Sequence, residues 1–281
     1  MLKQRIITAL VLLAILLPTL FYSEPWPFCL LALVFIAAAA WEWGRANGYG
    51  QGMSWLAGVV CCGLCGLMWQ QGWLTEHMPQ LWLWVGMAWV LGGAWILRSG
   101  VNAWKQHAKP LRWMGGVLAL SLTWLAIGQA KVIGVNFLLS ILALVWMADI
   151  GAYFAGRALG GRFTRSKLAA SISPGKSWEG VWGGMLGVAL MAWLWVVYDA
   201  RSHAQVLGFY THMFQKGGML LWLSVVFMAA MSVVGDLIES LVKRSAGIKD
   251  SSGLLPGHGG VLDRVDALLP TLPLAMMLYS L

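Results

Sequence analysis

Residues 217–240 read GGMLLWLSVVFMAAMSVVGDLIES, an apolar run that ends in two carboxylates, Asp236 and Glu239. Crossing ~30 Å of hydrocarbon takes about 20 apolar residues in a helix, and this run is long enough. A charged side chain inside a membrane helix costs about 2.5–3.5 kcal/mol on insertion scales, so such residues have a partner or a function. The stretch therefore predicts a membrane-spanning helix with a functional acidic end.

The rest of the chain has the same apolar character. Of its 281 residues 59% are hydrophobic and only 11% are charged, too few to cover the surface of a soluble domain of this length. Nineteen Trp residues fit membrane interfaces, which indole rings favour. Apolar segments can be drawn at 5–22, 28–44, 53–72, 79–97, 113–130, 132–156, 177–198, 217–240 and 261–280.

These segments predict an all-α, polytopic membrane protein with about nine transmembrane helices. Residues 1–130 supply N-terminal transmembrane helices, and residues 131–281 form a catalytic transmembrane region with cytoplasmic loops at 157–176 and 241–260. No internal repeat or soluble domain is visible, so we expect one integral membrane unit.

The basic residues predict the orientation, because cytoplasmic loops carry an excess of Lys and Arg. With a cytoplasmic N-terminus, sixteen of the nineteen fall on the cytoplasmic side: Lys3, Arg5, Arg45, Arg98, Lys105, Lys109, Arg112, Arg157, Arg162, Arg165, Lys167, Lys176, Lys243, Arg244, Lys249 and Arg264. Lys131, Arg201 and Lys216 fall on the other side, where we expect the C-terminus. The net charge of +8 reflects this bias and attracts anionic lipid head groups; no nucleic-acid-binding pattern accompanies it.

The acidic residues are unevenly placed. Seven of the eleven lie in or beside the two large cytoplasmic loops: Asp149, Glu179, Asp236, Glu239, Asp250, Asp263 and Asp266. A glycine-rich loop after the helix of Asp236 can return the chain so that Asp263 and Asp266 lie beside it. Clustered carboxylates near basic side chains suit Mg²⁺ with a bound polyphosphate. A network of ion pairs is the alternative that these residues leave open.

Two loops have features of phosphate sites. Residues 173–180, SPGKSWEG, place Lys176 and Ser177 at a helix start, where N–H groups and the helix dipole favour anions. A complete P-loop is absent because Ala170 stands where its first glycine is required. A Ser-capped helix with ordinary cytoplasmic lysines is the alternative. His258 lies between glycines and could contact phosphate, transfer a proton or be a bare loop residue.

Residues 240–266, SLVKRSAGIKDSSGLLPGHGGVLDRVD, closely resemble the signature of the phosphatidate cytidylyltransferases, the CDP-diacylglycerol synthases. Residues 146–157, WMADIGAYFAGR, and residues 173–180 resemble the family more weakly. The first ~130 residues match only as hydrophobic helices. Ile150 and residues 170–171 depart from the family's usual pattern.

The resemblance implies transfer of CMP from CTP to phosphatidic acid, giving CDP-diacylglycerol and pyrophosphate, at the cytoplasmic face of a bacterial inner membrane. It implies catalytic roles for Asp263, Asp236 and Lys176, and Mg²⁺ ligation by Asp236, Asp263 and Asp266. The substrate-binding residues that it implies are Asp149, Arg157, Lys167, Ser173, Ser177, Lys243, Arg244, His258 and Arg264. The expected partners are CTP, phosphatidic acid and membrane lipids, with no nucleic acid. A second cation at the site and a homodimer are left open.

Two other functions compete with this one. A CTP-dependent polyprenol or phytol kinase would have a similar architecture and nucleotide, and would transfer the γ-phosphate to an alcohol. An ion-coupled transporter would use Asp149 and Asp236 to bind ions near the middle of the membrane. The grouping of the acids beside glycine-rich loops at one face favours the enzyme.

Overall fold

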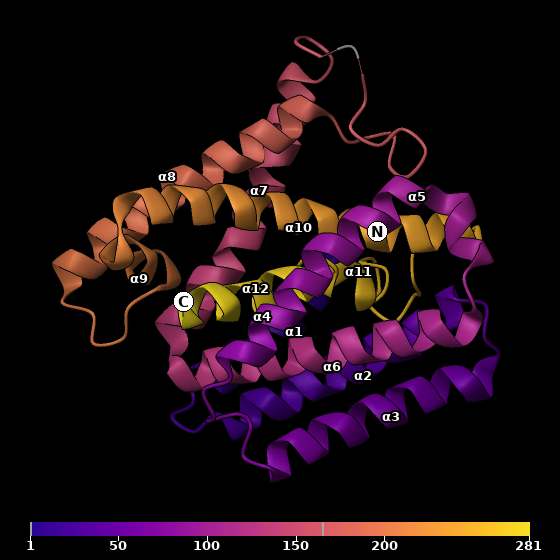
Figure 1. The fold of residues 1–281 in the computed structure, drawn as a ribbon, viewed down its shortest axis with the longest axis horizontal. Helices are drawn as coiled ribbons and strands as arrows, with labels where there is room; N and C mark the ends of the chain where they lie inside the picture. The colour runs from indigo at the N-terminus through magenta and orange to yellow at the C-terminus, as the bar shows by residue number, and fades with distance from the viewer. Residues whose placement is uncertain (1, 165) are drawn as a thin grey trace.

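The computed structural model describes residues 2–164 and 166–281 of the chain, so Arg165, one of the basic residues assigned above to the cytoplasmic side, lies outside the described residues. The helices, in chain order, are α1 Leu2–Phe21, α2 Trp26–Ala46, α3 Gln51–Gln70, α4 Pro79–Met87, the π-helical η1 Ala88–Gly92, α5 Gly93–Gln106, α6 Lys109–Ile133, α7 Val135–Leu159, α8 Trp178–Ser202, α9 Phe209–Lys216, α10 Gly218–Ala246, α11 Leu262–Val265 and α12 Leu268–Ser280 (Figure 1).

The fold is all-α, as predicted. Eight helices in the described part of the chain are long and apolar enough to cross a membrane, with Pro79–Gln106 counted as one continuous span. Such helices satisfy their own backbone hydrogen bonds, which lipid cannot do. The ninth predicted segment, 261–280, is divided into α11 and the 13-residue α12, which is too short to count as a span by itself. The short helix α9 was not predicted from the sequence.

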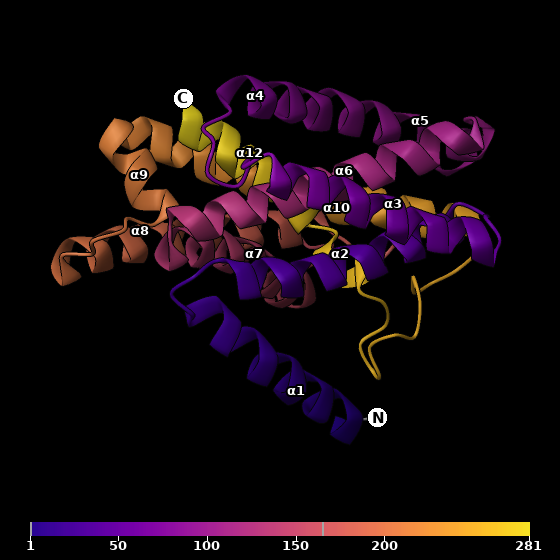
Figure 2. The ribbon, with the colours of Figure 1, turned by 90° about the horizontal axis from the view of Figure 1, so that it is seen from below.

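The centre of the bundle is α6, which packs against α2, α3, α7 and α12. Trp124 on α6 is fully buried, and its indole N–H donates to the carbonyl of Cys29 on α2 at 2.9 Å. In contrast, α1 contacts few other helices and splays away from the bundle in Figure 2. Its apolar side chains, including Ile7 and Leu10, are exposed, as suits a helix surrounded by lipid.

Glycines allow α7 and α8 to form a closely packed hairpin, which leans away from the other helices in Figure 1. A Cβ added at Gly184 would lie 2.7 Å from the carbonyl oxygen of Ala148, and one at Gly151 would lie 2.7 Å from that of Gly183. Small residues let membrane helices approach at backbone distance. The hairpin thereby fixes the loop before α8 relative to the polar side chains of α7.

Side-chain contacts tie together the segments at each end of the bundle. At one end, residues at the termini of α2, α5, α6 and α10 line a common cavity, and Arg5 Nε on α1 donates to the carbonyl of Gly257 at 2.9 Å. At the other end, Asp199 of α8 accepts hydrogen bonds from Asn136 Nδ2 at 2.8 Å and Thr211 Oγ1 at 2.6 Å. Asp199 thus fixes the short helix α9 against α7.

Candidate active site

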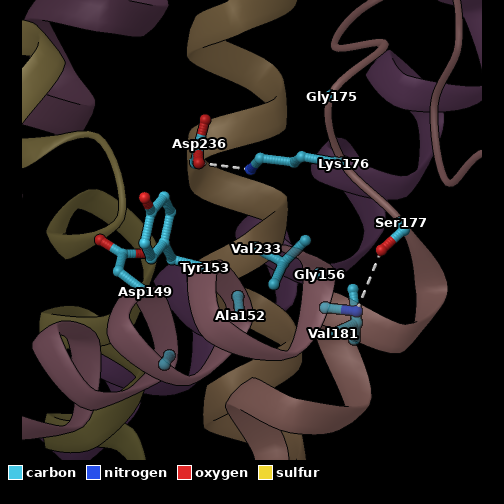
Figure 3. A pocket seen from close by; sticks show the side chains of 12 residues that line it. Asp149, Ala152, Tyr153, Gly156, Gly175, Lys176, Ser177, Val181, Val233 and Asp236 are labelled. Atoms are coloured by element: carbon cyan, nitrogen blue, oxygen red, sulfur yellow. Dashed lines mark hydrogen bonds and ion pairs between the residues drawn. The ribbon is translucent and has the colours of Figure 1, made fainter. Parts of the chain in front are cut away.

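A cavity of about 280 Å³ opens between α7, α8 and α10. Its polar lining comes from Asp149 and Tyr153 on α7, Lys176 and Ser177 before α8, and Asp236 on α10 (Figure 3). The Lys176 ammonium donates to Asp236 Oδ2 across the cavity. Three separate predictions from the sequence, Asp149, Lys176 and Asp236, therefore meet at one place.

The turn before α8 positions Lys176. Its backbone N–H donates to the carbonyl of Ser173 at 3.1 Å, and the following Ser177 caps α8 by accepting from the N–H of Gly180 at 3.2 Å. The Ser cap that the sequence offered as an alternative is therefore present. It leaves the start of α8 facing the cavity, where the helix dipole favours an anion.

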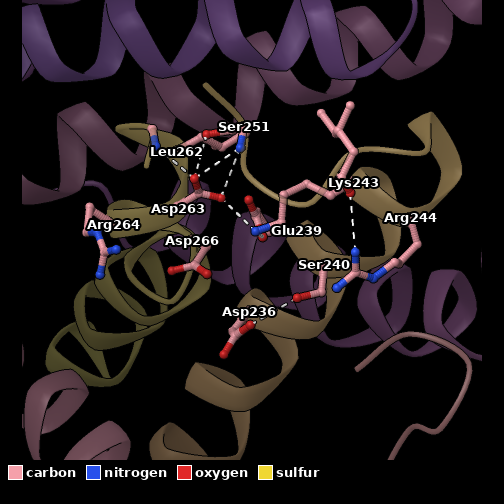
Figure 4. Close-up of polar contacts among 12 residues, drawn as sticks. Asp236, Glu239, Ser240, Lys243, Arg244, Ser251, Leu262, Asp263, Arg264 and Asp266 are labelled. Atoms are coloured by element: carbon pink, nitrogen blue, oxygen red, sulfur yellow. Dashed lines mark hydrogen bonds and ion pairs between the residues drawn. The ribbon is translucent and has the colours of Figure 1, made fainter. Parts of the chain in front are cut away.

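Asp236 and Asp266 are neighbours because α10 meets the α11–α12 segment at a glycine. A Cβ added at Gly235 would lie 2.8 Å from Cδ of Pro270 and would also meet the carbonyl oxygen of Asp266. Asp266 lies in the link before α12, outside the eight spanning helices. Burial, and then the negative charge of Asp236, raise the pKa of Asp266 above its usual range. Two carboxylates, Asp236 and Asp266, thus lie together (Figure 4), and Lys176 is the cation that contacts Asp236.

Asp263 is at the centre of a different set of contacts, which organise the loop between α10 and α11. Its carboxylate accepts from the N–H groups of Gly260 at 2.8 Å and Ser251 at 3.0 Å. Lys243 Nζ lies 2.6 Å from Asp263 and 2.7 Å from the buried Glu239 (Figure 4). Burial opposes ionisation of Asp263, but hydrogen bonds from Lys243 and from these backbone groups lower its pKa below the usual range.

Glu42 is a buried member of this arrangement that the sequence analysis missed. It lies on α2 with no exposed surface and accepts from the N–H groups of Val261 at 3.0 Å and Leu262 at 2.6 Å. It also accepts from the hydroxyls of Ser251, at 3.0 Å, and Ser252. The signal was present: Glu42 is a carboxylate inside an apolar segment, the same feature that singled out Asp149 and Asp236.

The structure places the other predicted residues around these two centres. Arg244 Nε donates to the carbonyl of Ile172 at 3.3 Å, which ties α10 to the loop before α8. Arg264 Nε donates to the carbonyl of His258 at 3.1 Å, and the buried Nδ1 of His258 has no hydrogen-bond partner within the described residues. Arg157 and Lys167 are exposed, and Arg157 donates to the Tyr153 hydroxyl at 3.1 Å.

The carboxylates are suited to a divalent cation, although they are not arranged as a complete site. Within residues 2–164 and 166–281, no three His, Cys, Asp or Glu side chains are placed to hold a metal ion. Lysines are the counter-ions instead: Lys176 pairs with Asp236, and Lys243 pairs with Asp263. Asp236 and Asp266, brought together where α10 packs against Asp266 and Pro270, are the carboxylates that fit a further cation (Figure 4).

Comparison with known proteins identifies the family. The model of the cytidylyltransferase family matches residues 3–281. The chain is similar to the phosphatidate cytidylyltransferase of Pseudomonas aeruginosa, with 39% identity over 100% of this chain and 98% of that protein. It is 34% identical to that of Haemophilus influenzae over 99% of both chains, and 39% identical to that of Thermotoga maritima over 51% of this chain and 48% of the relative. The chain therefore belongs to the cytidylyltransferase family.

Proposed function

We propose that this membrane protein transfers CMP from CTP to phosphatidic acid and forms CDP-diacylglycerol and pyrophosphate. The observation that carries the proposal is the cavity in which Asp149, Lys176 and Asp236 converge from α7, α8 and α10, in a member of the cytidylyltransferase family. The full-length relatives named phosphatidate cytidylyltransferase support this choice of substrates.

The reaction depends on placing positive charge beside the two phosphates. It does not need a strong base to activate the attacking oxygen. A phosphatidate oxygen forms the bond to the α-phosphorus of CTP, and the bond between the α-phosphorus and the bridging oxygen of pyrophosphate breaks. The attacking phosphate is already anionic near neutral pH. The main obstacle is repulsion between two polyanions, which preorganised cations and N–H dipoles offset. Lys176 and the start of α8 supply these groups at the cavity.

The charge of the carboxylates suits Mg²⁺, with Asp236, Asp263 and Asp266 as its proposed ligands. Magnesium prefers hard oxygen ligands, and when bound it would neutralise phosphate charge. Asp236 and Asp266 are held together by the packing at Gly235, and Asp263 is oriented by Ser251 and Gly260. Lys243 would then be close to the phosphates through its contact with Asp263.

The shape of the cavity suits one soluble and one lipid substrate. Its polar side holds Lys176 and Asp236, whereas Val181 and Val233 line its apolar side. Nearby Phe154 is 66% exposed, as expected of a side chain that faces lipid. We propose that the reaction occurs at the cytoplasmic surface of the inner membrane, with CTP entering from water and the acyl chains remaining in the bilayer.

The test uses the purified chain in mixed micelles that contain both phosphatidic acid and a lipid alcohol such as phytol, with CTP labelled with ³²P at either the α or the γ position. The proposal predicts that the α label enters the lipid and that the γ label leaves as pyrophosphate. The kinase alternative predicts the opposite: γ label in a lipid alcohol and α label in CDP. Label that stays in CTP in both reactions would contradict either enzyme.

The same assay tests the site with Asp236→Asn and a matched control, Glu76→Gln. Asp236 contacts Lys176 in the cavity, whereas the Glu76 side chain is exposed in the link before α4. Asp236→Asn should lower lipid labelling at least about 100-fold while the protein still inserts and purifies, because it removes charge from the reaction site. Equal labelling by the two variants would remove Asp236 from the proposal.

A further inference from the structure

A second cavity, of about 360 Å³, lies where the ends of α2, α5, α6 and α10 meet. Four basic side chains line it: Arg45, Lys105, Lys109 and Arg112. None of its lining residues also lines the cavity of Lys176 and Asp236. We call this second cavity the basic pocket. It is separate from the proposed reaction site.

Within the described residues, no carboxylate compensates the positive charge of the basic pocket. Across residues 2–164 and 166–281 none of its four basic side chains forms an ion pair with a carboxylate. Arg112 is only 7% exposed, and its buried Nε has no hydrogen-bond partner in this part of the chain. Buried charged donors are nearly always satisfied in native proteins, so an unpaired, buried guanidinium Nε beside a cavity points to an anionic ligand.

The walls of the basic pocket are held by specific hydrogen bonds. The Trp43 indole N–H donates to the carbonyl of Arg112 at 2.9 Å, and that of Trp104 donates to Asn47 Oδ1 at 3.2 Å. Asn47 Nδ2 in turn donates to the carbonyl of Trp43 at 2.9 Å. Gly100 breaks α5 with a φ of 79°, a conformation that favours glycine. The basic side chains therefore project from a preorganised frame.

The basic pocket also borders the loop that positions Asp263, because the two share Ser251. Ser251 lines the pocket, and its hydroxyl donates to Glu42 Oε2 at 3.0 Å and lies 3.1 Å from Asp263 Oδ2. Ser245 and Ile248 extend the lining along the end of α10 and the start of the same loop. An anion in the pocket would thus lie beside the segment that connects the two carboxylate centres.

We propose that the basic pocket is a second phosphate-binding site, which takes a phosphate monoester or a pyrophosphate group. Arg donors suit phosphate oxygens, and Lys105 and Lys109 add flexible point charges. A lipid phosphate such as phosphatidate and a soluble polyphosphate such as pyrophosphate present this same chemistry. The site is independent of the roles proposed for Lys176 and Asp236.

The experiment measures equilibrium binding of two ³²P-labelled probes, inorganic pyrophosphate and phosphatidate in mixed micelles, to the purified full chain. Lys105→Gln and Lys109→Gln each remove one pocket charge from an exposed side chain, so the fold should be retained. Arg98→Gln is the matched control, because Arg98 is an exposed cation on α5, the helix of Lys105, and does not line the pocket. Each protein is also prepared with Asp236→Asn, which alters the reaction site but no residue of the basic pocket.

We expect Lys105→Gln and Lys109→Gln to weaken binding of at least one probe about tenfold, the effect of losing one charge-assisted hydrogen bond. Arg98→Gln should bind as the wild type does, and the tenfold effect should persist with Asp236→Asn. Weakened pyrophosphate binding identifies a soluble polyphosphate, and weakened phosphatidate binding identifies a lipid phosphate. Wild-type affinity of both Lys variants for both probes, or equal weakening by Arg98→Gln, would overturn the proposal.

Discussion

The carboxylate of Glu42 on α2 accepts a hydrogen bond from the backbone N–H of Leu262, 2.6 Å away and 220 residues later in the chain. The same side chain holds Ser251, Ser252 and Val261. One buried acid from an early helix therefore fixes both the beginning and the end of the loop that positions Asp263.

Glu42→Gln should destabilise the protein by roughly 1–3 kcal/mol, because an amide replaces one acceptor oxygen and leaves buried N–H and hydroxyl donors unsatisfied. The measurement is thermal unfolding of the purified protein in detergent, followed by the labelling assay. Glu24→Gln is the control, since Glu24 is exposed in the link between α1 and α2. Equal unfolding midpoints for the two variants would show that Glu42 does not hold the loop.

Lys243→Met should destabilise the fold by about 3–5 kcal/mol, because it leaves the buried Glu239 and the partly buried Asp263 without their shared cation. The double variant Lys243→Met/Glu239→Met removes one of the stranded charges and should recover part of the loss. Both are measured by thermal unfolding. A double variant less stable than Lys243→Met would mean that Glu239 is stabilised by groups other than Lys243.

Gly235→Ala should reduce both stability and activity. The added methyl group would meet the carbonyl of Asp266 and the ring of Pro270, and overpacking of this kind typically costs about 1–3 kcal/mol. Because this contact also sets the separation of Asp236 and Asp266, lipid labelling should fall further than protein yield. Gly63→Ala on α3 is the control, since nothing lies within 4 Å of its added Cβ.

Lys176→Ala should lower kcat/KM for CTP by about 10–100-fold, as expected for the loss of one charge-assisted contact with phosphate. The measurement is the initial rate of lipid labelling at several CTP concentrations. Arg201→Gln, an exposed cation at the end of α8 remote from the Lys176 turn, should leave kcat/KM unchanged. An unchanged value for Lys176→Ala would show that Lys176 serves only as the counter-ion of Asp236.

Removal of divalent cations should abolish lipid labelling, and added Mg²⁺ should restore it. The carboxylates at Asp236 and Asp266 supply the hard oxygen ligands that this ion prefers. Asp266→Asn should raise the Mg²⁺ concentration needed for half-maximal activity, whereas Glu76→Gln should not. Full activity in excess chelator would contradict the proposed magnesium site.

The sequence predicted the helices well because membrane spans depend on local length and hydropathy. Residues 217–240 were recognised as one span, and the structure extends it to Gly218–Ala246. The contact between Lys176 and Asp236 could be anticipated from the sequence, because both residues lie in segments that resemble one family. The magnesium ligands and the phosphate contacts remain predictions.

The features that escaped prediction depend on contacts between distant segments. The position of α9 depends on Asp199, which lies on another helix, and its eight residues carry too few apolar side chains to stand out. The role of Glu42 depends on its hydrogen bonds with residues 251–262, which form only when α2 packs against that loop. Likewise, Arg45 and Lys105 were counted as cytoplasmic charges, and only the packing of α2, α5, α6 and α10 unites them in one pocket.

The link from Glu42 to Ser251 and Leu262 limits how this chain can be recombined with its relatives. A chimaera that takes residues 1–130 from one parent and residues 131–281 from another inherits the acid and its donors from different sources. Such a hybrid should fold productively only when both parents use the same acid–serine pairing. Gene shuffling across this junction would therefore select for matched halves.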